Sequence, residues 1–160
     1  MEETAISFRL ATLKDGEQLA DLRWRLQTGD ERSVDVSERI LFTDCFARLF
    51  AADEMHDYTH WVANVQERLV AVMSVKVVRQ LPTPQRLQGS WGYLTNCYVL
   101  PEYRNRGIGR KLLEHVKNWS ESQGCSLLIV WPSDGSYSFY RRFGFERGTD
   151  PLVFSLNLDT

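Results

Sequence analysis

The stretch that decides the fold is Val99-Leu100-Pro101-Glu102-Tyr103-Arg104-Asn105-Arg106-Gly107-Ile108-Gly109-Arg110-Lys111-Leu112-Leu113. It has the pattern of a strand end, a tight turn and the start of a helix. The first N–H groups of a helix have no acceptor within the helix, and the helix dipole places partial positive charge there. Gly107 and Gly109 leave this backbone open to a ligand. Four basic side chains surround it, at Arg104, Arg106, Arg110 and Lys111. The turn is therefore predicted to bind a phosphate or pyrophosphate.

Two common phosphate-binding signatures do not match this turn. A Walker A loop requires Gly-x-x-x-x-Gly-Lys-Ser/Thr, which the sequence lacks. A dinucleotide fingerprint requires a third glycine where this chain has Leu112. The pattern that remains is Arg104-x-x-Gly107-x-Gly109, which is short and needs a second segment to support it.

That second segment is Ser138-Phe139-Tyr140-Arg141-Arg142-Phe143-Gly144-Phe145-Glu146, which follows a nearly continuous apolar run. Together the two segments closely resemble the signatures of the GNAT superfamily of acetyl-CoA-dependent N-acetyltransferases. These signatures are Arg/Gln-x-x-Gly-x-Gly/Ala between a strand and a helix, and Phe/Leu-Tyr-x-x-x-Gly-Phe in a late helix and turn. The order of predicted elements from residue 6 onward also resembles this fold, so the resemblance covers nearly the whole chain.

Hydrophobic periodicity predicts the elements themselves. Strands are expected at 6–10, 58–65, 69–78, 91–99, 125–131, 144–145 and 152–158. Helices are expected over about 12–28, from Ser33 or Asp35 to Ala52, and over 107–123 and 134–142. The helix 107–123 connects two strands by one parallel step. The expected fold class is α/β (mixed α+β) and GNAT-like: a central mixed, mostly antiparallel sheet with splayed parallel strands at its centre and helices on both faces. Residues 1–160 are expected to form a single N-acetyltransferase domain.

Two of these elements carry specific packing expectations. The helix 35–52 is expected to bury an apolar stripe, made of Ile40, Leu41, Cys45, Leu49 and Phe50. The run 125–131 has the composition of a strand that is buried on both faces.

Composition indicates a protein of the cytoplasm. No apolar run approaches the roughly 20 residues of a membrane-spanning helix, and the acidic N-terminus lacks the apolar core of a signal peptide. The three cysteines are widely spaced, which argues against a disulfide framework and against a zinc site. The three histidines show no metal-ligand spacing. We therefore expect no metal and no membrane partner.

Charge is distributed unevenly along the chain. Residues 1–57 hold 13 acidic against 7 basic side chains, whereas residues 58–160 carry a net charge of +4. This is either ordinary surface variation or an acidic half that attracts a cationic acceptor. A nucleic-acid surface at 104–111 is disfavoured, because only four basic residues cluster there without interleaved aromatic side chains, in a chain of net charge −2.

The resemblance implies transfer of an acetyl group from acetyl-CoA to a primary amine by direct attack in a ternary complex. The acceptor is expected to be a small cationic amine or a peptide or protein amine. Strands 91–99 and 125–131 are expected to splay apart around the pantetheine arm. The implied cofactor-binding residues are Cys97, Tyr98 and Val99 on the strand, Arg104, Asn105, Arg106, Gly107, Ile108, Gly109 and Arg110 at the pyrophosphate, and Ser133, where relatives often have asparagine. A homodimer is compatible with the resemblance, since dimers are frequent in this superfamily.

The resemblance also assigns Tyr140 as the general acid that protonates the leaving thiolate. The general base stays open, because neither central strand contains Asp, Glu or His. The candidates are water relayed by the backbone, by Asn96 or by Thr95, and a carboxylate from the N-terminal helices. Cys97 as an acyl-carrying nucleophile is disfavoured, since no His lies near it in the sequence.

The missing carboxylate favours one competing function, a non-catalytic acyl-CoA-binding regulatory module on the same fold, whereas Tyr140 argues against it. Acceptor specificity is expected to reside in residues 20–60 and in the loop 82–89.

Overall fold

Five strands form one sheet in the order β1-β2-β3-β4-β5. The computed structural model describes residues 5–30, 35–148 and 151–156. Its strands are β1 (Ile6–Leu10), β2 (Tyr58–Val65), β3 (Arg68–Gln80), β4 (Gly89–Val99) and β5 (Cys125–Val130). Its helices are α1 (Gly16–Thr28), α2 (Val36–Ala51), α3 (Ile108–Ser122) and α4 (Tyr137–Phe143).

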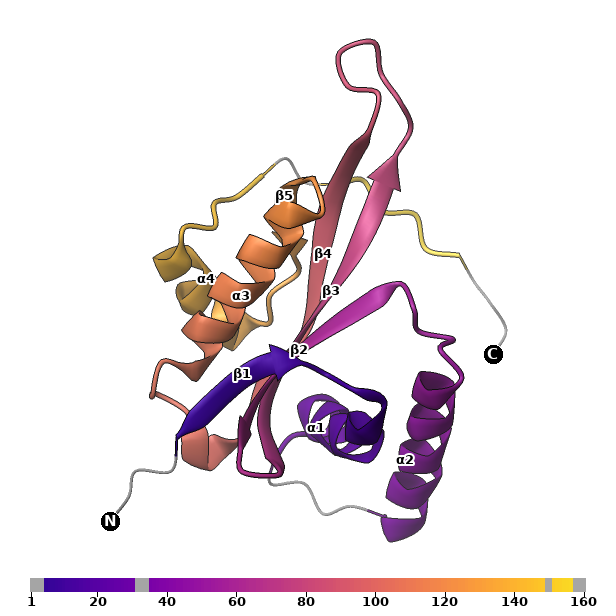
Figure 1. Ribbon diagram of the computed structural model, residues 1–160, viewed down its shortest axis with the longest axis vertical. Coiled ribbons are helices and arrows are strands. Elements are labelled where there is room, and N and C mark those ends of the chain that lie inside the picture. The colour runs from indigo at the N-terminus through magenta and orange to yellow at the C-terminus, as the bar shows by residue number, and fades with distance from the viewer. Residues whose placement is uncertain (1–4, 31–34, 149–150, 157–160) are drawn as a thin grey trace.

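The pairing confirms the expected fold class. The pairs β1–β2, β2–β3 and β3–β4 are antiparallel, and β4–β5 is parallel because α3 carries the chain back across the sheet. α1 and α2 lie on one side of the sheet, and α3 and α4 lie on the other (Figure 1). No described helix has both the length and the apolar composition that crossing a bilayer requires.

The core lies along β3 and receives both helical layers. β3 is buried continuously from Leu69 to Val75, as its dense β-branched sequence predicts. Leu19 and Leu22 of α1 and the apolar stripe of α3, which includes Leu112, pack against it. Beyond this core, β3 and β4 continue as a hairpin that projects from the body of the molecule (Figure 1). The loop between these two strands is exposed, as expected from its prolines.

The expected stripe of α2 is wrong in its details. Ile40 and Leu41 are 57% and 72% exposed, and Cys45 is exposed as well. α2 packs mainly on α1, through an aromatic row, and Phe50 of the expected stripe reaches the His60 ring of β2 at 5.7 Å. The Phe42 ring lies 5.4 Å from the Trp24 ring and 6.1 Å from the Phe46 ring. The apolar pattern predicted the helix but not the face that it buries.

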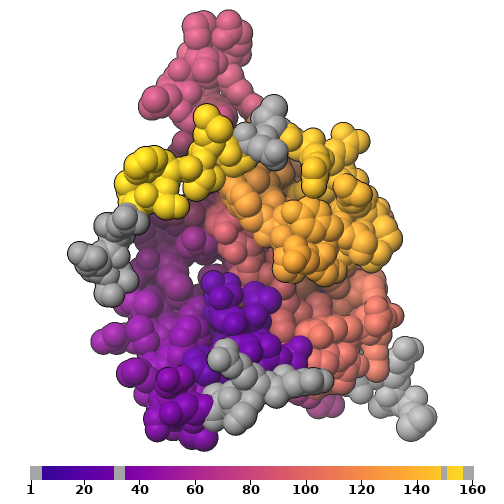
Figure 2. Space-filling model, turned by 180° about the vertical axis from the view of Figure 1, so that it is seen from behind, coloured from indigo at the N-terminus to yellow at the C-terminus, as the bar shows by residue number. Residues whose placement is uncertain are grey.

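The C-terminal end of the sheet also differs from the expectation. β5 is not buried on both faces, because Leu127 is 51% exposed. β5 is an edge strand, with β4 as its one strand neighbour among the described residues. Neither 144–145 nor the described part of the last expected strand, 152–156, pairs with another strand. The segment 151–156 (yellow in Figure 2) lies on the surface with its apolar side chains exposed. Residues 157 and 158 of that expected strand lie outside the described residues.

Candidate active site

A cavity of about 1070 Å³ follows the side of β4 that β5 leaves open. The parallel pairing ends at Leu94 and Val130, although β4 continues to Val99. Residues 95–99 therefore have a strand partner on the β3 side alone. The end of α1, the turn before α3, the residues after β5 and α4 supply the other walls. The expected splay of the two strands is present in the structure at this point.

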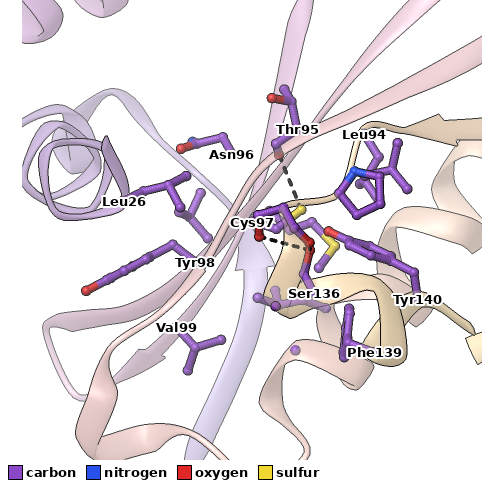
Figure 3. Close-up of a pocket in the computed structure, with 18 of the residues that line it drawn as sticks. Leu26, Leu94, Thr95, Asn96, Cys97, Tyr98, Val99, Ser136, Phe139 and Tyr140 are labelled. Atoms are coloured by element: carbon purple, nitrogen blue, oxygen red, sulfur yellow. Dashed lines mark hydrogen bonds between the residues drawn. The ribbon is translucent and has the colours of Figure 1, made fainter. Parts of the chain in front are cut away.

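A bulge in β4 sets the direction of the side chains at the centre of this cavity. Between the Ser74–Thr95 and Val72–Tyr98 pairs, β4 has two residues, Asn96 and Cys97, where β3 has Met73 alone. Asn96 adopts a left-handed conformation with φ of 53°. As a result, Asn96 points toward α1 whereas Cys97 points toward α4 (Figure 3).

The turn before α3 has the structure of an anion site. Asn105 and Gly107 adopt left-handed conformations, with φ of 60° and 75°. The first helical bond runs from the Lys111 amide to the Gly107 carbonyl, at 3.1 Å. Among the described residues, no backbone carbonyl accepts a hydrogen bond from the six amides of residues 105–110. This run of free N–H groups at the start of a helix fits a phosphate or diphosphate group.

Gly109 allows α4 to approach this turn. A Cβ atom at Gly109 would lie 3.3 Å from the Phe139 ring, which is closer than a comfortable contact. The glycine of the motif therefore brings α4, which carries Tyr140, against the start of α3.

The arginines of the motif are not equivalent. The guanidinium of Arg104 donates to the Val99 carbonyl and to the Asp30 carboxylate, both at 2.9 Å. Arg110 lines the cavity and lies over the Phe143 ring. Arg106 does not line the cavity, and its guanidinium lies over the Tyr103 ring at 5.5 Å.

The other implied cofactor-binding residues all line the cavity: Cys97, Tyr98, Val99, Asn105, Gly107, Ile108, Gly109 and Ser133. The Ser133 hydroxyl donates to the Ser136 hydroxyl at 3.1 Å, so it is held at the edge of the cavity after β5.

Tyr140 and Cys97 meet at the inner end of the cavity. Tyr140 is 4% exposed, and its side chain lies beside that of Cys97 (Figure 3). The Cys97 S–H lies 3.5 Å from the Thr95 carbonyl, which accepts from it. Burial, with the neighbouring Cys97, raises the pKa of Tyr140 far above its usual value, so the phenol keeps its proton. Burial raises the pKa of Cys97 to about 12, so its thiol is a poor nucleophile at neutral pH.

The end of α1 forms the opposite wall. Leu26, Gln27 and Asp30 line the cavity there. Asp30 accepts hydrogen bonds from the Tyr98 hydroxyl and from Arg104. Burial acts to raise the pKa of Asp30, but these two donors outweigh it and hold that pKa below its usual value. Asp30, just beyond the end of α1, is thus the carboxylate from the N-terminal region that lines the cavity. It already accepts hydrogen bonds from Tyr98 and Arg104.

Sequence reasoning missed several residues of this site. Arg23, Arg25 and Arg142 line the cavity, as does Asp30. Arg142 lies within the late motif, so the sequence could have indicated that it lines the site. The residues of α1 belong to no motif that would have indicated this. Of the regions expected to set specificity, 23–30 contributes to the lining, but no described residue of 35–60 or 82–89 does. The described part of the chain contains no cluster of three or more His, Cys, Asp or Glu side chains suited to a metal.

Comparison with known proteins identifies the family. A sequence model of the Acetyltransferase (GNAT) family matches residues 17–145. The chain belongs to this family. Both signatures that the sequence shares with GNAT enzymes lie within the matched region.

Curated GNAT relatives match shorter segments of the chain. It is 35% identical over 54 residues to a glucosamine 6-phosphate N-acetyltransferase of Trypanosoma brucei brucei, covering 34% of this chain and 37% of that protein. It is 31% identical over 74 residues to an aminoglycoside N(6')-acetyltransferase type 1 of Stenotrophomonas maltophilia, covering 42% and 46%. The matches thus span less than half the length of these relatives.

Solved GNAT structures share the fold over almost the full length. A predicted acetyltransferase with acetyl-CoA from Clostridium acetobutylicum has a TM-score of 0.72 at 23% identity, covering 94% of this chain and 96% of that one. Glucosamine-6-phosphate N-acetyltransferase from Arabidopsis thaliana has a TM-score of 0.72 at 18% identity, covering 96% and 99%. At this level of identity the likeness concerns the fold.

Proposed function

We propose that this chain is an N-acetyltransferase that moves an acetyl group from acetyl-CoA to a primary amine. One observation carries the proposal: a single cavity is lined both by Asn105 and residues 107–110, whose backbone amides are free, and by the buried side chain of Tyr140. Between them lies the part of β4 that β5 leaves unpaired. This arrangement supports a diphosphate at the start of α3 and a thioester beside Tyr140, with the arm that joins them along residues 97–99.

The chemistry follows from these positions. The amine nitrogen attacks the thioester carbonyl carbon, a C–N bond forms, and the C–S bond breaks. Tyr140 donates its proton to the leaving sulfur, and its raised pKa keeps that proton available at neutral pH. Its position beside Cys97 supports this role, because Cys97 and Tyr140 line the same end of the cavity, where the arm along residues 97–99 would place the sulfur.

Removal of the amine proton falls to water in this proposal. Asp30 is the one carboxylate among the described residues that line the cavity, and Tyr98 and Arg104 already occupy it. Its lowered pKa makes it a weak base. The neutral form of the amine then binds, and the extra proton passes to solvent after the attack.

The lining favours an acceptor that carries acidic or hydroxyl groups beside its amine. Five arginines line the cavity against Asp30. Arg25, Arg104 and Arg110 pair with Asp21, Asp30 and Glu114, which leaves Arg23 and Arg142 without an ion pair among the described residues. The acidic character of residues 1–57 therefore has little effect at the cavity, and a purely cationic acceptor has less support. Two relatives are named for amino-sugar acceptors, glucosamine 6-phosphate and aminoglycosides. We include both classes, with a polyamine and a peptide amine, among the acceptors to test.

The direct test is thiol release from acetyl-CoA across this set of amines, with CoA binding measured separately. Tyr140→Phe is expected to bind CoA normally and to lose roughly 100-fold or more in turnover. Tyr137→Phe is the matched control, because Tyr137 lies on the same helix, is exposed and does not line the cavity. Tight CoA binding without thiol release from any amine would instead support the non-catalytic acyl-CoA-binding module.

A further inference from the structure

A chain of buried polar side chains runs through the sheet to the bulge of β4. The Ser74 hydroxyl lies 2.6 Å from His60 Nδ1, and Asn96 Nδ2 donates to the same hydroxyl at 3.0 Å. The three residues come from adjacent strands, β2, β3 and β4. All three are buried, with Ser74 1% and Asn96 9% exposed. Of the three, only Asn96 lines the cavity.

The hydrogen-bond donors and acceptors of His60, Ser74 and Asn96 are compatible with one arrangement of protons. Burial lowers the pKa of His60 to about 4, so the ring is neutral at physiological pH. Asn96 Nδ2 donates to Ser74 Oγ, and the Ser74 proton is then directed to His60 Nδ1. The Asn96 amide is thereby fixed in orientation, and so is the backbone that carries it.

This arrangement costs stability. His60 Nε2 and Asn96 Oδ1 are buried and have no hydrogen-bond partner among the described residues. A buried polar group without a partner is unfavourable, because it loses its hydrogen bonds to water and gains none in the protein. Asn96 also holds a left-handed conformation, which L-residues adopt rarely. Apolar residues of the core surround the chain, so packing alone would be better served by aliphatic side chains.

Strain and unpaired polar groups that concentrate at one point beside a cavity indicate a functional demand. Asn96 immediately precedes Cys97, and Cys97 meets Tyr140. A β4 strand without the bulge would place Asn96 and Cys97 differently, because one residue of shift exchanges the faces of a strand.

We propose that His60, Ser74 and Asn96 are positioning residues that lock the β4 bulge and thereby hold Cys97 against Tyr140. The proposal rests on the proposed function. In this proposal the side chains of His60, Ser74 and Asn96 do not contact the acetyl group. It acts by keeping the phenol directed at the position of the leaving sulfur.

The test is a double-mutant cycle between Ser74 and Tyr140. Ser74→Ala removes the oxygen that both neighbours contact, and it is expected to lower kcat about tenfold while the Kd of CoA stays within twofold. Because Ser74 acts through Tyr140, the double variant should be no slower than Tyr140→Phe alone. A loss in the double variant equal to the product of the two single losses would overturn the proposal, since it would mean that Ser74 acts independently of Tyr140.

Two further variants make the result decisive. Asn96→Gly keeps the left-handed conformation without strain but removes the amide, so it should reproduce the loss of Ser74→Ala. Wild-type turnover in Asn96→Gly would overturn the proposal. Ser120→Ala is the control, because Ser120 is also buried with an unpaired hydroxyl but lies on α3, away from the cavity. If Tyr140→Phe keeps full turnover, the acid role of Tyr140 fails, and the positioning role fails with it, although the chain is still an acetyltransferase. If the wild type releases thiol with no amine, the proposed function itself fails, which separates the two ideas.

Discussion

Arg104 and Asp30 form an ion pair at 2.9 Å that joins the two sides of the cavity. Arg104 belongs to the turn that presents the free amides, and Asp30 lies just beyond α1 on the opposite wall. The same Asp30 carboxylate accepts from Tyr98, so a single side chain ties the end of α1 to both β4 and the turn.

Asp30→Ala should therefore weaken use of the amine more than binding of CoA. Loss of the carboxylate frees the end of α1, whereas the amides of residues 105–110 stay in place. We expect the KM for the amine to rise roughly fivefold, as for a partly exposed ion pair of about 1 kcal/mol, and the Kd of CoA to change less than twofold. Steady-state kinetics and calorimetric titration measure the two quantities. Asp57→Ala is the control, because Asp57 pairs with Lys76 and neither residue lines the cavity. A weakened CoA affinity with an unchanged amine KM would contradict this expectation.

Asp15 should make stability depend on acid pH. Its carboxylate accepts from Arg9 at 2.7 and 2.9 Å and from the Thr12 amide at 2.6 Å. The Arg9 hydrogen bonds, against the opposing effect of burial, hold the pKa of Asp15 below its usual 3.8. A lowered pKa in the folded state adds stability above the unfolded-state pKa, and this stability is lost as the pH falls through the folded-state pKa.

Asp15→Asn is accordingly expected to lower the free energy of unfolding by about 1–3 kcal/mol at pH 7. The gap between this variant and the wild type should narrow as the pH falls below about 4. Urea denaturation at pH 7 and pH 3 measures both values. Glu17 is exposed and close to Asp15 in the sequence, so Glu17→Gln should leave the free energy of unfolding unchanged at both pH values. A gap of equal size at both pH values would refute the linkage.

Gly92 should not tolerate a side chain. A Cβ atom there would lie 2.5 Å from Leu128 Cδ2 of β5 and 3.1 Å from Val75 Cγ2 of β3, the two strands that flank β4. Gly92→Ala is expected to cost about 1–3 kcal/mol of stability through overpacking, visible as a lower Tm. Leu128→Ala added to it should recover part of that loss, because it vacates the same space. Gly148→Ala, where a Cβ meets nothing within 4 Å, serves as the control. An unchanged Tm in Gly92→Ala would contradict the close approach.

Local sequence patterns predicted the parts of the site that are local in structure. The turn 104–110 and the position of Tyr140 follow from short motifs in which backbone conformation is set by neighbouring residues. The apolar pattern of α2 indicated a helix, but which face is buried depends on α1, a partner that the pattern does not contain. The same holds for 152–156, where an apolar run predicts a strand but does not determine which strand it would pair with.

Contacts between distant residues account for what the sequence did not reveal. Asp30 meets Arg104 across 74 positions, and His60 meets Ser74 across a hairpin. Neither pair leaves a periodic signal. The bulge at Asn96 is equally silent, because it arises from a mismatch in register between two strands rather than from a turn residue such as glycine.

The free amides of residues 105–110 bear on how this sequence can drift over evolutionary time. An amide donor belongs to the main chain, so exchange of most side chains leaves it intact. Constraint falls on Asn105 and Gly107, which must be left-handed, and on Gly109, which must be small. Proline is the one residue that would delete a donor at any of the six positions. A row of amide donors of this kind can persist while most of the side chains along it are substituted.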